Sequence, residues 1–266
     1  MPPTGKRLKN RLMNYKYYYT YGVFDVVRRH EKNILARLSP ECLHTVAIEE
    51  ARRCDSLILV SPDYPITTDR TEELVSLDEK NLIARDAVEP LAALVHASEA
   101  ACGEKILFTS VYRTLEFQKS IYGVNPFAAK PGESEHHSGL SADIKVEGYA
   151  QRRFIMSKTG KWMAKNAHRF GFIIRYPLWA EKRTGVDYEP WHLRYVGIPH
   201  AEIIYRMKIT LEEYLELLEA GAFYRYGNTV ISRQTGKKID FPKTVEDICI
   251  SADSRGGYIA WGTETV

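Results

Sequence analysis

The chain has few cysteines, no long apolar run and no glycine-rich phosphate loop, and each absence excludes a class of protein. No stretch of about eighteen apolar residues occurs, so no transmembrane segment is predicted. Repeats and low-complexity tracts are also absent, and without a glycine-rich loop nucleotide binding has no support. The cysteines have no Cys-x-x-Cys spacing, which argues against a zinc knuckle or a dense disulfide framework and favours free, buried thiols: Cys42, Cys54, Cys102 and Cys249.

What is present is the composition of an ordinary soluble globular protein. The 266 residues are 44% hydrophobic and 27% charged, with a net charge of +3 that is too small to require a nucleic-acid partner. Five basic residues precede the first acidic one, Asp25, and we interpret them as a solvated N-terminus rather than an anion-binding patch. No secretory-signal core is visible, so we expect either a cytoplasmic protein or an exported domain that lacks its signal. No oligomeric state is predicted.

Apolar periodicity predicts an α+β fold, mainly an antiparallel sheet flanked by helices, with a small C-terminal β appendage. Helices are predicted over 30–38, 86–102 with Gly103 closing it, 161–170 ending at Gly171, and 210–221 with a capping box between Thr210 and Glu213. Strands are predicted over 14–22, from 57 onward, and over 105–113, 139–146, 172–177 and 191–196. We divide the chain into an N-terminal lead of unclear role (1–56), a main domain (57–220) and the β appendage (221–266).

Two histidines stand just ahead of an aspartate in SEHHSGLSADI, residues 134–144, inside a run of small and apolar residues. A catalytic zinc ion needs three protein ligands and an open position for water. His136 and Asp143 supply two, and His192 in YEPWHLRYV supplies the third. Because the spacing from His136 to Asp143 is odd, His136 must lie in a loop before the strand that carries Asp143. His137 would then point away from the metal.

Two further residues complete a hydrolytic site around one zinc ion per chain. Zinc lowers the pKa of bound water from about 15.7 toward about 7, so a nearby carboxylate can finish the deprotonation at neutral pH. Glu189, three residues before His192, is the candidate base. The tetrahedral intermediate of peptide hydrolysis also needs a fixed positive charge for its oxyanion, and Arg113 at the end of a predicted strand is the candidate. Arg175 is interpreted as a structural ion-pair partner.

The ordered set SVYRTLEFQ, SEHHSGLSADI, FGFIIRYP and TGVDYEPWHLRYVG resembles the VanY-like zinc D,D-carboxypeptidases, over roughly residues 57–216. The resemblance implies a metal-site fold shared with D,D-dipeptidases and the hedgehog signalling domain, with His136, Asp143 and His192 on zinc, Glu189 as base and Arg113 at the oxyanion. It also implies that Ser134 and Gln118 contact the substrate near its C-terminal carboxylate. Two positions depart from the family pattern. Ser141 stands where alanine is usual, and Val111 stands where glycine is usual.

The resemblance makes a peptidoglycan stem peptide, or its precursor, the expected partner. Ser110 lies three residues before Arg113, where dipeptidase-like members carry an acid and carboxypeptidase-like members carry serine. A neutral hydroxyl suits a longer peptide, so we predict removal of one D-alanine from pentapeptides ending in D-Ala-D-Ala. Trp191, adjacent to His192, is either core or pocket wall. The alternatives are an L,D-carboxypeptidase, a D,D-dipeptidase, an endopeptidase acting within cross-linked peptides, or a zinc-stabilised binding module without catalysis.

Overall fold

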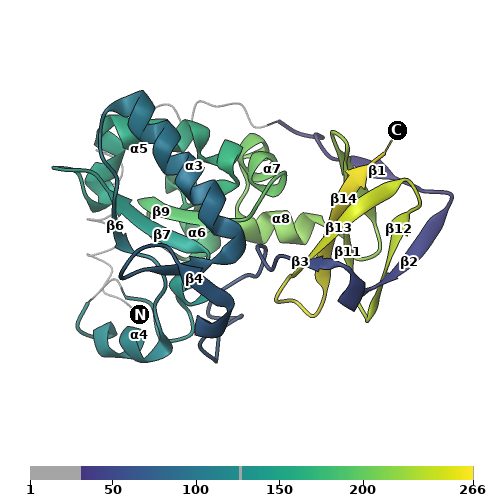
Figure 1. Cartoon of the computed structure of the whole chain (residues 1–266), viewed down its shortest axis with the longest axis horizontal. Coiled ribbons are helices and arrows are strands. Elements are labelled where there is room, and N and C mark those ends of the chain that lie inside the picture. Colours follow the sequence, from purple (N-terminus) through teal and green to yellow (C-terminus); the bar gives the residue numbers. More distant parts are fainter. Residues whose placement is uncertain (1–30, 126–127, 266) are drawn as a thin grey trace.

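The structure is a computed structural model that describes residues 31–125 and 128–265. It has two lobes (Figure 1): a four-stranded sheet surrounded by helices on the left, and an all-β lobe on the right. Helix α8 (Leu211–Leu217) lies between them. The architecture confirms the predicted α+β class with antiparallel sheets and flanking helices.

The four-stranded sheet has the order β6-β7-β9-β8, and all three pairings are antiparallel. Its strands are β6 Leu107–Ser110, β7 Ser141–Lys145, β8 Phe172–Tyr176 and β9 Glu189–Tyr195, in agreement with four predicted strands. The register places Asp143 opposite both Ser110 on β6 and His192 on β9. One row across three strands therefore brings together polar residues that lie as far apart in the sequence as Ser110 and His192.

Helices cover this sheet, and the predicted ends are mostly confirmed. The longest helix among the described residues, α3 (Arg85–Cys102), ends at Gly103 in the left-handed conformation. The predicted 161–170 helix is α5 followed by a 3-10 turn that ends at Gly171, while α8 keeps its predicted capping box but ends before Gly221. The remaining helices are α4 Leu115–Ile121, α5 Lys158–Asn166, α6 Glu181–Thr184 and α7 His200–Met207. The 3-10 turns are Ile48–Glu50, Thr71–Glu73, Glu135–Ser138, Gln151–Met156, Ala167–Phe170 and Leu178–Ala180.

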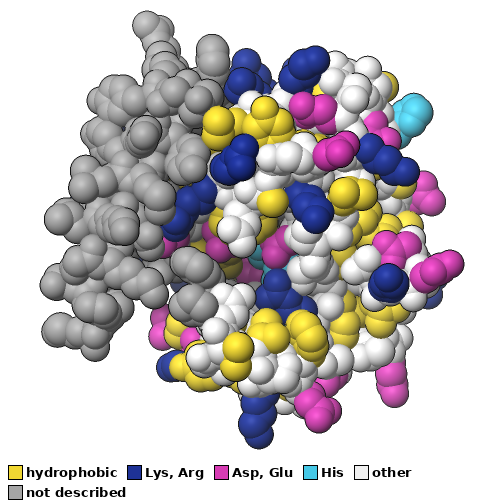
Figure 2. Space-filling model, turned by 90° about the vertical axis from the view of Figure 1, so that its left-hand side faces the viewer, with side chains coloured by type: hydrophobic (Ala, Val, Ile, Leu, Met, Phe, Trp, Pro, Cys, Tyr) yellow, Lys and Arg dark blue, Asp and Glu magenta, His cyan; other side chains and the backbone are white. Residues whose placement is uncertain are grey.

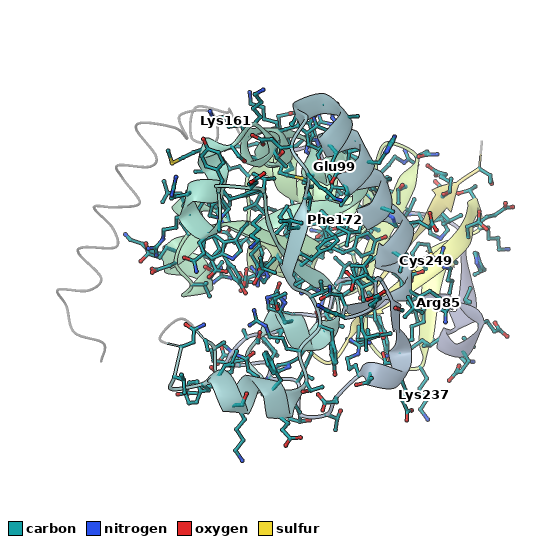
Figure 3. All side chains as sticks on the ribbon, turned by 60° about the vertical axis from the view of Figure 1, so that its left-hand side comes forward. Arg85, Glu99, Lys161, Phe172, Lys237 and Cys249 are labelled. Atoms are coloured by element: carbon teal, nitrogen blue, oxygen red, sulfur yellow. The ribbon has the colours of Figure 1, made fainter. Side chains whose placement is uncertain are left out.

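The core beneath α3 is apolar. Leu91, Leu94 and Phe172 are fully buried there with Leu193 of β9, and Figure 3 shows Phe172 beside α3. A short hairpin of β4 (Leu74–Ser76) and β5 (Leu82–Ala84) leads into α3. This packing supports one face of the four-stranded sheet.

The β lobe is built from both ends of the described chain. Its six-stranded sheet has the order β1-β10-β11-β14-β13-β3, and β12 pairs with β2. The N-terminal strands are β1 Ala36–Leu38, β2 Leu43–Ala47 and β3 Arg52–Arg53. The C-terminal strands are β10 Phe223–Tyr226, β11 Thr229–Gln234, β12 Lys238–Pro242, β13 Val245–Ala252 and β14 Tyr258–Glu264. The lead whose role the sequence left open thus contributes β1 and β3 to the six-stranded sheet and β2 to the pair with β12.

Two predictions for the N-terminal third were wrong. No helix forms in residues 31–38, because Ala36–Leu38 pairs with Phe223–Arg225 as a strand, a contact that local sequence does not encode. The apolar stretch from Leu57 is buried but forms no strand; its backbone groups bond side chains instead, for example the Leu57 amide to Ser251 Oγ at 2.8 Å. The strand predicted over 14–22 lies outside the described residues.

All four cysteines are free, but the expectation that they are buried was wrong. Cys42 is exposed, and the other three are partly exposed. None of the helices in the described ranges has the length and apolarity needed to cross a bilayer.

Candidate active site

His136, Asp143 and His192 converge at one point of the four-stranded sheet, and one ligand atom from each lies within 4.8 Å of the others. Asp143 Oδ1 is 2.8 Å from His192 Nδ1, and Asp143 Oδ2 is 3.2 Å from His136 Nε2. Asp143 and His192 face each other across β7 and β9, whereas His136 lies on the 3-10 turn before β7. The turn explains how an odd spacing can bring His136 and Asp143 together.

Three hydrogen bonds join the turn to the segment that follows strand β6. The His136 ring pairs through Nδ1 with the Val111 carbonyl oxygen at 2.5 Å, and the Arg113 amide donates to the His136 carbonyl at 3.2 Å. The His137 ring turns the other way, with its Nδ1 2.8 Å from the Arg113 carbonyl oxygen. The two adjacent histidines thus have different partners. His137 points away from the cluster, as expected, and fixes the backbone of Arg113.

Gly139 closes this turn, and only glycine fits there. Its φ is +71°, and a Cβ would overlap the side chain of Leu74. Its carbonyl accepts a hydrogen bond from the Ala84 amide at 2.8 Å, which joins the turn to β5. The chain therefore reverses from the turn into β7 without displacing the hairpin beneath it.

The electrostatics of the cluster suit a bound cation. Burial would raise the pKa of Asp143, but the two histidines outweigh it and hold that pKa well below its ordinary value. Burial would lower the pKa of His192, but Asp143 outweighs it and raises that pKa to about 9. His192 Nε2 is buried and makes no hydrogen bond within the described residues.

The donor set fits a zinc ion. With Nδ1 of His136 directed at the Val111 carbonyl, the lone pair of Nε2 faces Asp143. Two imidazole nitrogens and one carboxylate oxygen are the ligands that catalytic zinc takes, leaving a further position open. A metal bound here would replace the proton that the His192–Asp143 pair shares in its absence.

Glu189 begins β9, with its carboxylate 3.7 Å from His192 Nδ1. Its side chain is 21% exposed, so it lies at the edge of the cluster where a small molecule can reach it. Burial of most of the carboxylate raises its pKa to about 7, with Asp143 adding to the effect. A carboxyl group with a pKa near neutrality is suited to accept and return a proton.

Arg113 lies on the other side of Asp143, and three of its five N–H groups are engaged within the described residues. Nε donates to Ser110 Oγ at 2.7 Å, Nη1 to Gln118 Oε1 at 3.5 Å and Nη2 to Asp143 Oδ2 at 3.3 Å. Burial lowers its pKa, although Asp143 and Glu189 oppose that effect. The guanidinium is thus held in one orientation, with two N–H groups free to donate to a further group.

The residues expected to contact substrate lie in different environments. Gln118 is fully buried and donates to the Ala129 carbonyl at 2.8 Å, which favours a role in holding Arg113 over direct contact. Ser110 also holds Arg113, and Ser134 is buried just before the turn. Trp191 packs with the apolar cluster under α3, on the sheet face opposite His192, so its position favours core over pocket wall.

A buried ionic network beneath His192 escaped the sequence analysis. Glu135 Oε1 accepts from Arg175 Nε and from Arg194 Nη1, both at 2.8 Å, and Arg175 also pairs with Glu212 at 2.6 Å. Arg175 was expected to be an ion-pair partner, which is confirmed. The only local signal for Glu135 was its position beside His136, and its partners Arg175 and Arg194 come from β8 and β9.

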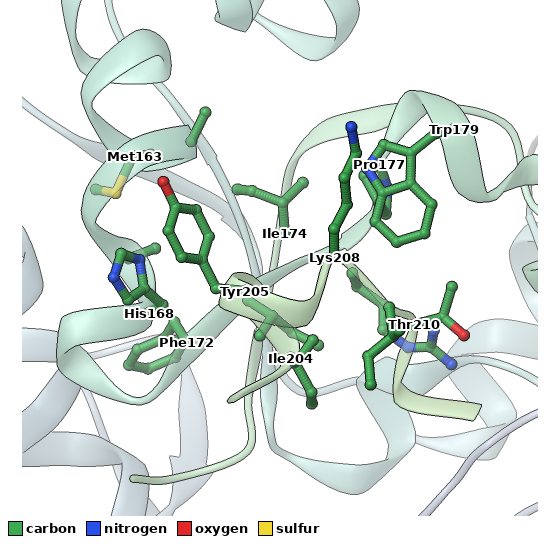
Figure 4. Close-up of a pocket in the computed structure, with 15 residues that line it drawn as sticks. Met163, His168, Phe172, Ile174, Pro177, Trp179, Ile204, Tyr205, Lys208 and Thr210 are labelled. Carbon is green, nitrogen blue, oxygen red and sulfur yellow. The ribbon is translucent and has the colours of Figure 1, made fainter. Parts of the chain in front are cut away.

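The hollow at this site is distinct from a second pocket elsewhere on the protein. Figure 2 shows a hollow with acidic side chains and a histidine at its bottom and a basic side chain beside it. The side chains of Asp143, Glu189 and Arg113 are each partly exposed. Figure 4 shows a different pocket, next to the stacked rings of His168 and Tyr205, whose centroids are 3.6 Å apart. That pocket contains no member of the metal cluster.

Comparison with known proteins agrees with this geometry. The family model described as "VanY: D-alanyl-D-alanine carboxypeptidase" matches residues 80–198, which include the metal cluster, Glu189 and Arg113. The crystal structure of a vancomycin resistance D,D-pentapeptidase VanY with Zn(II) is 36% identical, with a TM-score of 0.52 over 60% of this chain and 98% of that chain. The chain belongs to the VanY family.

Other relatives of the family extend the likeness. The D,D-dipeptidase VanXYg, solved with a D-Ala-D-Ala phosphinate analogue, is 26% identical with a TM-score of 0.68, over 84% of this chain and 100% of that chain. A D-alanyl-D-alanine carboxypeptidase of Enterococcus faecium is 31% identical over 181 residues, which is 62% of this chain and 58% of the relative. The match thus spans a little over half the length of that curated relative.

Proposed function

We propose that this VanY-family protein is a zinc D,D-carboxypeptidase that removes the terminal D-alanine from peptidoglycan stem peptides ending in D-Ala-D-Ala. The observation that carries the proposal is the placing of a partly exposed carboxylate, Glu189, and a fixed cation, Arg113, on either side of the His136–Asp143–His192 cluster. Relatives named for this activity, and the VanY structure with Zn(II), support the same conclusion. We assign the activity to a domain of residues 57–220. We propose that this domain has the metal-site fold of hedgehog-type proteins.

One zinc ion per chain would be held by His136, Asp143 and His192. Bound there, zinc would polarise the scissile carbonyl and make water a stronger acid. The Val111 carbonyl keeps the His136 lone pair directed into the cluster, and the negative charge of Asp143 offsets part of the charge of the metal.

Glu189 is the general base and then the general acid. As a carboxylate it takes a proton from the attacking water, and as a carboxylic acid it returns that proton to the nitrogen of the departing D-alanine. A pKa raised to about 7 allows both forms near neutral pH. Its position at the start of β9 keeps it beside His192 while leaving it partly open to solvent.

Arg113 stabilises the oxyanion that forms when water adds to the carbonyl carbon. Ser110, Gln118 and Asp143 fix the guanidinium before the reaction, so little reorganisation is needed when the charge develops. The two N–H groups that these residues leave free are the donors we assign to the oxyanion.

A longer peptide is the preferred substrate. A dipeptidase must place the ammonium group of free D-Ala-D-Ala near the scissile bond, and burying that charge without an acidic partner is costly. Ser110, the residue opposite Asp143 on β6, is neutral and its hydroxyl already accepts from Arg113. We therefore infer that an acylated amine is accepted more readily than a free one.

The decisive experiment compares kcat/KM for three substrates: an acylated Lys-D-Ala-D-Ala tripeptide, free D-Ala-D-Ala, and a tetrapeptide whose terminal bond is L,D. We expect the tripeptide to be preferred, with mass spectrometry showing loss of one D-alanine. Preference for the free dipeptide would identify a D,D-dipeptidase, and preference for the tetrapeptide an L,D-carboxypeptidase. No hydrolysis by zinc-loaded protein would favour the non-catalytic binding module.

Elemental analysis tests the metal independently of substrate. Protein saturated with zinc should contain about one equivalent, and His136→Ala should lose it because only two ligands remain. Unchanged zinc content in this variant would show that the metal binds elsewhere.

A further inference from the structure

We infer that Glu135 is a positioning residue that holds His192 in the orientation needed to bind the metal. The inference rests on the proposed zinc function and assigns a role to a residue that touches neither substrate nor metal. Glu135 is fully buried, and its Oε2 lies 3.7 Å from His192 Nε2. That nitrogen makes no hydrogen bond to any described residue, so this carboxylate is the anion it faces.

The two carboxylate oxygens of Glu135 have different partners. Oε1 accepts from Arg175 and Arg194, while Oε2 lies within 3.3 Å of the Ser141 hydroxyl and faces His192. The two arginines therefore keep the carboxylate ionised and fix its plane without occupying the oxygen that faces the imidazole. Ser141, one of the two departures from the family pattern, adds a donor to that same oxygen.

A carboxylate beside Nε2 determines which nitrogen of His192 is available to the metal. With the proton of a neutral imidazole on Nε2, directed at Glu135, the lone pair lies on Nδ1, which faces Asp143 at 2.8 Å. His136 has the opposite arrangement, because its Nδ1 pairs with the Val111 carbonyl and its Nε2 faces Asp143. The two histidine ligands thus use different nitrogens, each selected by an acceptor on its far side.

Glu135 also links the elements that carry the ligands. It shares the 3-10 turn with His136, and its partner Arg194 lies two residues after His192 on β9. Arg175 connects the same carboxylate to β8 and, through Glu212, to α8. Without the negative charge of Glu135, the guanidinium groups of Arg175 and Arg194 would lie beside the metal ligand His192. Glu212 would then be the remaining counter-ion of this network.

The test compares Glu135→Gln with Glu212→Gln, which removes the same charge from the far end of the network. Zinc dissociation constants are measured by competition with a chelator, without substrate, after circular dichroism has shown that each variant is folded. We expect Glu135→Gln to bind zinc about 10- to 100-fold more weakly, the range typical for partners of ligating histidines, and Glu212→Gln to change affinity less than about twofold. Equal affinities for the Glu135→Gln variant and the unmodified protein would overturn the inference.

A second measurement needs no variant and holds even if Glu135→Gln fails to fold. Long-range ¹H–¹⁵N spectra of the zinc-loaded, unmodified protein report which imidazole nitrogen carries a proton. We expect the proton on Nε2 of His192 and on Nδ1 of His136, and a proton on Nδ1 of His192 would overturn the inference. If both measurements agree and no peptide is hydrolysed, the proposed activity fails while the role of Glu135 stands; absence of any zinc binding overturns both.

Discussion

The four-stranded sheet and the six-stranded sheet bury different kinds of side chain. Around β7 and β9 the buried residues include the charged network of Glu135, Arg175 and Arg194 as well as the metal cluster. In the C-terminal part of the β lobe the core is apolar. Among the described residues of that part, the buried carboxylate is Asp253, which pairs with Arg233 at 2.6 Å. Buried ion pairs fix geometry more reliably than they add stability, whereas buried apolar area contributes stability directly. The four-stranded sheet thus holds charged side chains in fixed positions, whereas the β lobe buries mainly apolar side chains that contribute stability.

The largest expected effect tests the chemical side of that contrast. Replacing Glu189 with glutamine should lower kcat by about 100- to 10,000-fold, the usual cost of losing a general base, because the amide cannot take the proton. The unfolding temperature should not fall, since burial already disfavours the charge that is removed. Turnover, zinc content and thermal unfolding are measured on one preparation. Near-normal turnover would place the base elsewhere.

The reverse result is expected in the apolar core of the β lobe. Phe241 of β12 is fully buried and lies edge-on against Phe223, with ring centroids 6.0 Å apart. Phe241→Ala should lower the free energy of unfolding by about 3–5 kcal/mol through lost apolar contact and the cavity left behind. The kcat of the folded fraction should stay unchanged. Denaturant unfolding and active-site-normalised turnover measure the two quantities, and a parallel fall in kcat would show that the lobes are coupled.

Arg113 sharpens the comparison because it is a partly buried charge to which we assign a role in catalysis. Arg113→Ala should reduce kcat by about 100- to 1,000-fold, as loss of an oxyanion donor does, with a smaller change in KM. Ser110→Ala keeps the guanidinium but removes the acceptor of its Nε–H, and should cost less. Equal losses in the two variants would indicate that Ser110 acts directly on the substrate.

Much of the lobe that holds the metal cluster could be predicted because its signals are local or have fixed spacing. The capping box of α8, the glycine that ends α3 and the ligand spacing across the 3-10 turn each follow from a few neighbouring residues. The strand Ala36–Leu38 could not be predicted, because its partner lies nearly two hundred positions away. Glu135 was missed for a similar reason. Its role depends on ion pairs with Arg175 and Arg194, which form only once β8 and β9 are in register.

The smallest expected effect concerns the outer end of the ionic network, and it depends on pH. Glu212 is partly shielded, and although burial would raise its pKa, Arg175 outweighs burial and lowers that pKa below its ordinary value of 4.5. A carboxyl group whose pKa is lower in the folded than in the unfolded state stabilises the fold above its unfolded pKa, and this contribution is lost as the pH falls through its folded pKa. Thermal unfolding from pH 6 to pH 3 should therefore show the unmodified protein more stable than Glu212→Gln above about pH 5. The difference should shrink steadily below that pH. A difference that is constant across the range would mean that Glu212 contributes through packing rather than through its charge.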